Sequence, residues 1–307
     1  MKKITSIIRG KLRLGAIYNK VITIYKRLLS SYYQKKKKIS VMSFEDTIDE
    51  ILKRERSVIR FGDGEMTIIG GQNIGFQKSS KELSRHLGNI IKSECDNTLI
   101  CIPSMVAGNT EKLTQRAKKW WDDYRNSEFY IWQAYLSSDV TYGETNVSRF
   151  YVGIEDKNLS SIIINKIKKI WENKKLLIVE GEFTRNGVGN DLFAAAKSVS
   201  RVICPAENAY DKHKEIIEYV ASIADSYDEI LVTLGPTAKV VVYELARLNI
   251  RAIDLGHLDN EYEWFLADKG VRVDIPGKYV NEISGGNTVS NENIDPKYWK
   301  EIIFEIK

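Results

Sequence analysis

Two carboxylates stand two positions apart in the segment RFGDGE at residues 60–65. The glycines around them let the backbone turn tightly, so that both side chains can face one point. Carboxylate oxygens suit a hard divalent cation, which can in turn bridge to a diphosphate. Asp63 and Glu65 are therefore candidate metal ligands. Arg60 and Gly62 are candidate contacts for the phosphate. An ordinary acidic turn is the alternative.

A glycine-rich segment at residues 181–191 offers a second site for an anion. It is expected to follow a strand and to open a helix, whose first N–H groups would be free to bind a phosphate. The segment matches neither standard phosphate-loop pattern, and a plain strand-to-helix turn is the alternative. Its candidate ligand-binding residues are Arg185, Gly187, Gly189, Asn190 and Asp191.

A third loop, LGPTAK at residues 234–239, also joins an expected strand to an expected helix. Proline suits the first position of a helix, and the free N–H groups there attract anions. Gly235, Thr237 and Lys239 are the candidate phosphate contacts. A capped helix with a solvated lysine is the alternative.

The segment 254–264 is dense in groups able to transfer protons. Asp254, His257, Asp259 and Glu261 are the candidates for a general base, with no preference among them. Some of these acids are expected to do no more than stabilise the start of a helix.

These loops lie between elements that alternate along the chain. Short apolar runs that end at glycine or proline predict strands, and helical spacing of apolar residues predicts the helices between them. The predicted strands are 57–61, 98–102, 129–132, 176–179, 201–204, 229–234 and 251–255. The predicted helices are 43–56, 80–94, 110–125, 159–172, one after residue 189, 211–224 and one ending at residue 248. Such alternation predicts an α/β fold with a Rossmann-like, mainly parallel sheet, whose ligands bind at the carboxyl ends of the strands.

The charge of the chain is unevenly distributed. The 307 residues carry a net charge of +5, yet residues 1–40 hold 12 Lys and Arg and no acid, which leaves residues 41–307 acidic. The first 40 residues predict a basic amphipathic helical arm, separate from a domain at 41–307. Such an arm suits an anionic membrane surface, and packing on the domain or on a partner is the alternative. We expect no nucleic-acid partner, because the body is acidic and lacks a known nucleic-acid module.

No apolar run is long enough to span a bilayer, and the arm lacks the pattern of a secretory signal. The three cysteines form no metal or disulfide spacing and are expected to be free thiols in a reducing compartment. We therefore expect a cytoplasmic protein, peripheral on the inner membrane face if the arm binds lipid.

Five of these segments, in this order, resemble the GT-D fold glycosyltransferases, best known from the glycosylation of streptococcal serine-rich adhesins. The resemblance covers about residues 42–305. The segments are RFGDGE at 60–65, GVGNDLF at 187–193, CPAENAY at 204–210, LGPTA at 234–238 and DLGHLD at 254–259.

The resemblance implies a UDP-sugar donor, usually UDP-glucose, and Mn²⁺ or Mg²⁺ held at a DxE motif that matches residues 63–65. It implies that 187–191 and 234–238 form part of the nucleotide site, with Pro205 and Asn208 as a further wall toward the base. The family often has Ser-Arg-Pro-Tyr where this chain reads SRFY at 148–151. Arg149 is retained, so a contact with the diphosphate is still expected.

The sequence thus predicts transfer of a hexose, preferably glucose, from a UDP-sugar to a lipid-linked or protein-linked glycan. The product would be a surface glycoprotein or polysaccharide. One alternative is another metal-dependent nucleotide enzyme, a phospho- or nucleotidyltransferase. The other is a non-catalytic nucleotide-binding module held at the membrane.

Overall fold

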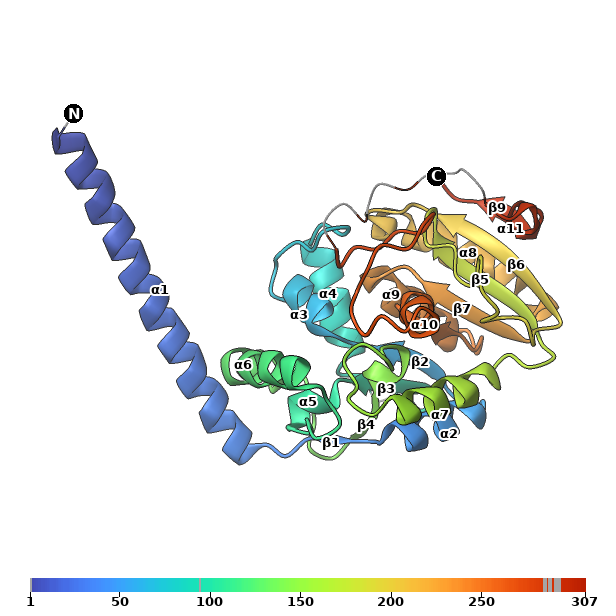
Figure 1. Cartoon of the computed structure of the whole chain (residues 1–307), viewed down its shortest axis with the longest axis horizontal. Coiled ribbons are helices and arrows are strands. Elements are labelled where there is room, and N and C mark those ends of the chain that lie inside the picture. Colours follow the sequence, from blue (N-terminus) through green and yellow to red (C-terminus); the bar gives the residue numbers. More distant parts are fainter. Residues whose placement is uncertain (1, 94, 284–285, 287–288, 290–293) are drawn as a thin grey trace.

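A single nine-stranded sheet forms the centre of the computed structural model (Figure 1). The structure describes residues 2–93, 95–283, 286, 289 and 294–307, with the backbone alone over 2–17. Every neighbouring pair of strands is parallel, in the order β1-β4-β3-β2-β8-β7-β5-β6-β9. The strands are β1 (Ser40–Val41), β2 (Ser57–Arg60), β3 (Thr98–Ile102), β4 (Thr141–Glu144), β5 (Lys175–Gly181), β6 (Ser198–Cys204), β7 (Glu229–Thr233), β8 (Ile253–Asp254) and β9 (Ile302–Glu305).

Helices cover both faces of the sheet. They are α1 (Lys2–Lys36), α2 (Phe44–Leu52), α3 (Asp63–Ile69), α4 (Lys81–Ile90), α5 (Ser104–Ala107), α6 (Gln115–Trp132), α7 (Lys157–Lys168), α8 (His213–Ile223), α9 (Pro236–Arg247), α10 (Leu258–Leu266) and α11 (Pro296–Glu301). Single 3₁₀ turns span Thr145–Ser148, Ala209–Lys212 and Ala224–Ser226.

The core has two parts, one on each face of the sheet. Helices α4, α6, α8 and α9 pack on one face, and α2, α7 and α10 pack on the other. Alternate residues of each strand enter alternate parts: Ile59 and Leu177 face the first set of helices, whereas Val58 and Leu176 face the second. Since successive strand side chains point to opposite faces, strands buried on both sides read as continuous apolar runs.

The α/β class and the parallel sheet predicted from the sequence are confirmed. Three local predictions are wrong. Residues 129–132 are the last turn of α6 rather than a strand, and their aromatic side chains enter the core from a helix. The helix predicted over 110–125 begins only at Gln115 and continues to Trp132. The stretch from 182 to 197 forms turns and no helix, so β5 reaches β6 without a helical crossover.

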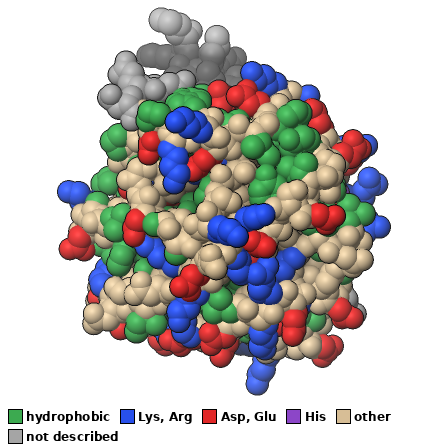
Figure 2. Space-filling view, turned by 90° about the vertical axis from the view of Figure 1, so that its right-hand side faces the viewer, with side chains coloured by type: hydrophobic (Ala, Val, Ile, Leu, Met, Phe, Trp, Pro, Cys, Tyr) green, Lys and Arg blue, Asp and Glu red, His purple; other side chains and the backbone are tan. Residues whose placement is uncertain are grey.

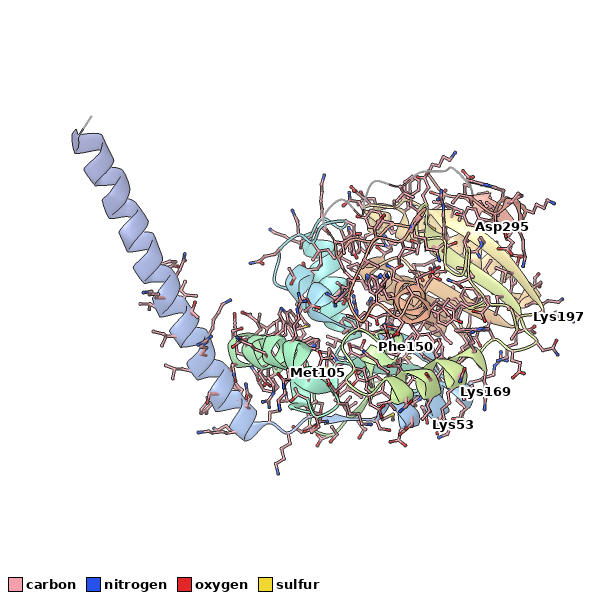
Figure 3. All side chains as sticks on the ribbon, viewed as in Figure 1. Lys53, Met105, Phe150, Lys169, Lys197 and Asp295 are labelled. Atoms are coloured by element: carbon pink, nitrogen blue, oxygen red, sulfur yellow. The ribbon has the colours of Figure 1, made fainter. Side chains whose placement is uncertain are left out.

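The basic arm forms α1, which extends away from the body (Figure 1). The described side chains of α1 contact the domain in its C-terminal part, where Lys26 pairs with Glu128 of α6 at 3.3 Å and Gln34 donates to the carbonyl of Arg125. Many of the described side chains of α1 project into solvent, whereas Ser30 is buried (Figure 3). Whereas α1 carries basic side chains and no acid, the face of the domain around β6 and α11 carries intermixed charges of both signs (Figure 2). No described helix combines the length and apolarity needed to cross a bilayer.

A buried ion pair joins β5 to β6 close to their carboxyl ends. The guanidinium of Arg201 donates to Glu180 at 2.6 Å and to Glu301 at 2.8 Å, and both Arg201 and Glu180 are almost fully buried. The other carboxylate oxygen of Glu180 accepts the backbone and side-chain N–H groups of Asn186. The pair therefore fixes the loop that leaves β5.

Arg201→Met is expected to lower the free energy of unfolding by about 3–5 kcal/mol, because it leaves the Glu180 carboxylate buried without its cation. Urea denaturation followed by circular dichroism measures the change. Lys297→Met is the control: it removes an exposed partner of the same Glu301, 3.7 Å away, and should change stability by about 0.5 kcal/mol or less. Equal losses in the two variants would contradict this account.

Candidate active site

The carboxyl ends of seven neighbouring strands, β4 to β6 in the order of the sheet, open into one cleft of about 1120 Å³. This is the edge at which parallel α/β sheets bind ligands. The predicted site residues that line the cleft are Arg60, Gly62, Asp63, Glu65, Arg149, Pro205, Asn208, Gly235, Lys239, His257 and Glu261. The others, Arg185, Gly187, Gly189, Asn190, Asp191, Thr237, Asp254 and Asp259, lie behind or beside its wall.

The two candidate metal ligands lie in the first turn of α3. Asp63 is exposed to the cleft and takes part in no ion pair with the described residues. Although its side chain is open to the cleft, the surrounding cleft walls raise the pKa of Asp63. The charge of Arg149 opposes this rise, and the charge of Glu65 adds to it. Both carboxylate oxygens of Glu65 have protein partners. One accepts the N–H of Gly62 at 2.8 Å, and the other lies 3.0 Å from the ammonium of Lys239.

The donor set at this point fits a nucleotide-bound cation better than a resident one. Among the described residues, no three His, Cys, Asp or Glu side chains gather as a metal site. Mg²⁺ at phosphate-transfer sites is commonly held by one or two carboxylates, with substrate phosphates and water as the other ligands. Asp63, with Glu65 beside it, meets that requirement.

Asp254 is buried behind the wall of the cleft. Its carboxylate lies 3.0 Å from Lys239 and 3.3 Å from Arg60, whose backbone N–H it also accepts. Burial alone would raise the pKa of Asp254, but Lys239 and Arg60 outweigh it and hold the pKa below its usual value. Gly256 is left-handed at φ +57°, and a Cβ there would meet Arg60 at 1.5 Å, so only glycine fits.

Lys239 and Arg60 make their polar contacts with protein groups. The ammonium of Lys239 reaches Glu65, Asp254 and the carbonyl of Gly235 at 3.0 to 3.2 Å. Arg60 donates to the carbonyls of Asp254 and Thr145, besides Ser148. In this arrangement both cations position neighbouring groups. Thr237 is also buried, with Gln77 as the partner of its hydroxyl at 3.3 Å.

Asp259 anchors the glycine-rich loop from below. One of its oxygens accepts the N–H of Gly187 and the amide of Asn190, both at 2.8 Å, and the other accepts Lys278 at 2.6 Å. The side chain of Phe193 fills the space where a Cβ of Gly187 would lie. Because Asp259 is 2% exposed and fully paired, its role in this structure is to hold the loop.

The remaining residues of that loop point elsewhere. Asp191 is exposed and pairs with Lys168 at 3.0 Å and with the hydroxyl of Tyr262. Arg185 is buried and donates to the carbonyl of Gly277 at 2.6 Å. The cleft is instead lined from this side by Thr184 and Asn186, and from β6 by Pro205, Ala206 and Asn208.

Arg149 is the cation that faces the cleft from the β4 side. It forms an ion pair with Glu282 at 2.5 Å and donates to Nδ1 of His257 at 3.0 Å. Burial and then Arg149 lower the pKa of His257 from 6.5 to about 4, so this imidazole is neutral near pH 7. Burial alone would raise the pKa of Glu282, but His257 and Arg149 lower it to about 2.

Glu261 lines the cleft, but its carboxylate is hydrogen-bonded to the backbone. It accepts the N–H groups of Tyr151 and Val152 at 3.1 and 2.9 Å, which shapes the turn that presents Arg149. Burial raises its pKa, and Arg149 opposes the shift. The four candidate bases are therefore all engaged with protein groups here, and the identity of the base stays open.

Sequence reasoning missed Trp120 and Glu282, which line the cleft, and Lys278, which lies behind its wall. Glu282 and Lys278 follow α10 in a stretch without regular structure, where no strand end marks them as site residues. Trp120 lies in a helix that was predicted without regard to its aromatic side chains. The pair Trp120-Trp121 in a polar helix was the available signal.

Comparisons with known proteins agree with this geometry. The model of the family described as Glycosyltransferase GT-D fold matches residues 58–283, which contain the strand ends just described. The chain belongs to this family. It is 39% identical over 246 residues to a probable glycosyl transferase, Gly, of Streptococcus gordonii, and 37% identical over 245 residues to the glycosyltransferase GlyD of Streptococcus pneumoniae. Each match takes in 80% of this chain, but the chain spans only about a third of the length of these curated relatives, 36% and 30%.

Solved members of the family have the same architecture. One, described as a highly conserved domain of unknown function with a distinct glycosyltransferase fold, superposes with a TM-score of 0.81 at 34% identity. The superposition covers 93% of this chain and all of the solved structure. A second, described as a new glycosyltransferase from Streptococcus sanguinis, gives a TM-score of 0.76 at 37% identity, with 88% of this chain and all of its own covered.

Protonation of His257 is expected to make the protein less stable in mild acid. The unfolded chain binds this proton near pH 6.5 and the folded chain only near pH 4, so stability falls as the pH drops from 6.5 to 4. His257→Gln removes this contribution and should lose less stability than the wild type over that window. Urea titrations at several pH values measure it, with pH 8 as the common reference. Parallel curves for the two proteins would contradict the assignment.

Proposed function

We propose that the chain is a metal-dependent glycosyltransferase that moves a hexose, with glucose preferred, from a UDP-sugar to a glycan acceptor. The acceptor would be lipid-linked or protein-linked, in the synthesis of a surface glycoprotein or polysaccharide. The observation that carries the proposal is the exposed Asp63 beside Glu65, at the carboxyl ends of the strands. The chain that holds them belongs to a family of glycosyltransferases.

In this proposal Asp63 and Glu65 hold Mn²⁺ or Mg²⁺ against the donor's diphosphate. When bound, the cation acts as a Lewis acid that stabilises the negative charge of departing UDP. Arg149 adds a second positive charge at the same end once the diphosphate replaces Glu282 as its partner. Lys239 and Arg60 fix the carboxylates rather than the substrate, and Pro205 and Asn208 form the wall toward the base.

Hydrolysis of the donor by the full chain tests this proposal. With Mn²⁺ present, release of free nucleotide is measured over a panel of UDP-, GDP- and dTDP-sugars. We expect UDP release from one UDP-hexose, abolished by EDTA. Asp63→Asn should weaken Mn²⁺-dependent UDP binding at least about 10-fold, because it removes the cleft's uncommitted carboxylate.

Asp225→Asn is the matched control for this experiment, since Asp225 is an exposed carboxylate outside the cleft. It should retain UDP binding and turnover. Calorimetry of UDP binding covers the case of an enzyme that turns over only with its acceptor. Turnover of a nucleoside triphosphate instead would favour the phospho- or nucleotidyltransferase. UDP binding without turnover on any donor or acceptor would favour the non-catalytic module.

For α1 we propose attachment to an anionic membrane surface on the cytoplasmic side. Its described part leaves an apolar strip uncovered: Val21, Ile24 and Leu28 are each more than half exposed. The helix carries basic side chains and no acid along its length. Apolar side chains that enter the lipid boundary, with lysines near anionic headgroups, are the usual means of such attachment.

The full chain should sediment with vesicles of phosphatidylcholine and phosphatidylserine but not with phosphatidylcholine alone, and less as salt increases. Changing Val21, Ile24 and Leu28 together to Ser should reduce the bound fraction at least about 10-fold. Ile162→Ser, an exposed apolar residue of α7, serves as control and should bind as the wild type. Equal binding to both kinds of vesicle would overturn the proposal.

A further inference from the structure

The cleft is larger than one substrate needs. Pockets that enclose one small ligand measure roughly 300–1,000 Å³, whereas this cleft measures about 1120 Å³. The sheet order places β7, β5 and β6 on one side of Asp254 and β3, β4 and β1 on the other (Figure 1). The short helix α5 contacts β1 and α6, so α6 borders the cleft on the side away from the glycine-rich loop.

The two ends of the cleft differ in chemistry. The end at β5, β6 and β7 presents glycines and small polar groups, including Gly181, Asn186 and Gly235. The α6 end presents Leu113, Ala117, Trp120 and Trp121, with Arg116 at its rim. Under the proposed function the diphosphate lies near Asp63, which follows β2 between the two ends, and the base lies toward Pro205 and Asn208 at the polar end. The aromatic end is then left without a ligand.

Trp120 is exposed to an extent unusual for its size. Its side chain is 49% accessible, although it lies within a cleft. The ring stacks on Tyr124, with centroids 5.2 Å apart and planes 11° apart, and meets Trp121 edge-on at 4.8 Å. An apolar surface that remains uncovered in a concave site indicates a binding partner.

The support of this ring is rigid. The hydroxyl of Tyr124 accepts a hydrogen bond from Nε1 of Trp132 at 3.2 Å, and Trp132 is fully buried in the core. Trp121 closes the cluster edge-on against Tyr124 at 5.5 Å. Trp120 therefore presents a flat face whose orientation is set before any ligand binds, which lowers the entropic cost of binding.

The acceptor sugar is the substrate that suits this face. Aromatic rings carry a negative face, against which the C–H groups on one side of a pyranose ring can pack. The hydroxyls on the rim of the sugar remain free for solvent or Arg116. The cluster opens into the same cleft as Asp63 and Glu65, since Trp120 and Trp121 line it together with these carboxylates.

We propose that Trp120, held by Trp121 and Tyr124, is the platform on which the acceptor sugar ring stacks. The acceptor then enters the cleft along α6, and the donor lies over the strand ends. This inference rests on the proposed transferase function. Trp264 of α10 is unsuited to this role, because its side chain is fully buried and donates to the carbonyl of Val273.

Two measurements on the full chain test the platform. The first is transfer from the active UDP-hexose to p-nitrophenyl glycosides of glucose, galactose, N-acetylglucosamine and N-acetylgalactosamine. The second is saturation-transfer NMR of the same glycosides with UDP and Mg²⁺ bound, which reports acceptor contact without turnover. Trp120→Ala should raise the KM for the acceptor about 10-fold or abolish its NMR signal, and change the KM for the donor less than about two-fold.

Trp120→Phe keeps a smaller aromatic face and should recover part of the acceptor binding. Trp299→Ala is the matched control, because Trp299 is 48% exposed on α11 outside the cleft, and it should behave as the wild type. Loss of UDP affinity in Trp120→Ala would overturn the inference in favour of a platform for the base. Unchanged acceptor KM and NMR signal, or no NMR signal from any glycoside on the wild type, would also overturn it. Failure of the proposed function is distinct: the wild type would neither bind UDP nor release it.

Discussion

The buried carboxylate of Asp254 is the interaction on which the arrangement of the cleft depends. It closes the short strand β8, and it is compensated by one cation from β2, Arg60, and one from α9, Lys239. Lys239 extends the link to Glu65 of α3. Four elements thus meet at one point through charges that are costly to bury singly. Asp63, in the same turn of α3 as Glu65, is held at the mouth of the cleft as a consequence.

This network also decides which charges remain for a substrate. A cation that is shared between two buried carboxylates has little affinity left for a phosphate, so Lys239 stabilises the site rather than the ligand. Asp63 and Arg149 differ: among the described residues the first takes part in no ion pair, and the second pairs directly with Glu282. A diphosphate with its divalent cation carries charges complementary to both. The exchange of Glu282 for a phosphate at Arg149 would leave the net charge around that guanidinium nearly unchanged.

The sequence predicted six of the nine strands, β2, β3 and β5 to β8, because each contains a short apolar run, and it predicted the loops after them because glycine or proline marks their ends. It missed β1, β4 and β9; β1 has only two residues, and β4 reads TYGE. It could assign types of residue to the cleft but not their partners. Asp259 and Asp254 looked like acids for catalysis, and only the tertiary structure brings Lys278 and Lys239 against them. The strand predicted at 129–132 failed because aromatic residues favour strands on average, whereas here they continue the buried side of a helix.

Helix α6 connects the two surfaces that the strand ends do not explain. Its C-terminal part receives α1, through Lys26 on Glu128 and through Ser30, whose hydroxyl accepts the N–H of Tyr130. Its first turns carry Trp120 into the cleft. An arm that lies on a membrane would therefore set the position of the same helix that presents the acceptor platform. For an acceptor attached to a lipid, α6 would then link the membrane-bound arm to the proposed sugar-binding face. A UDP-sugar donor, as proposed, would diffuse freely and could enter over the strand ends.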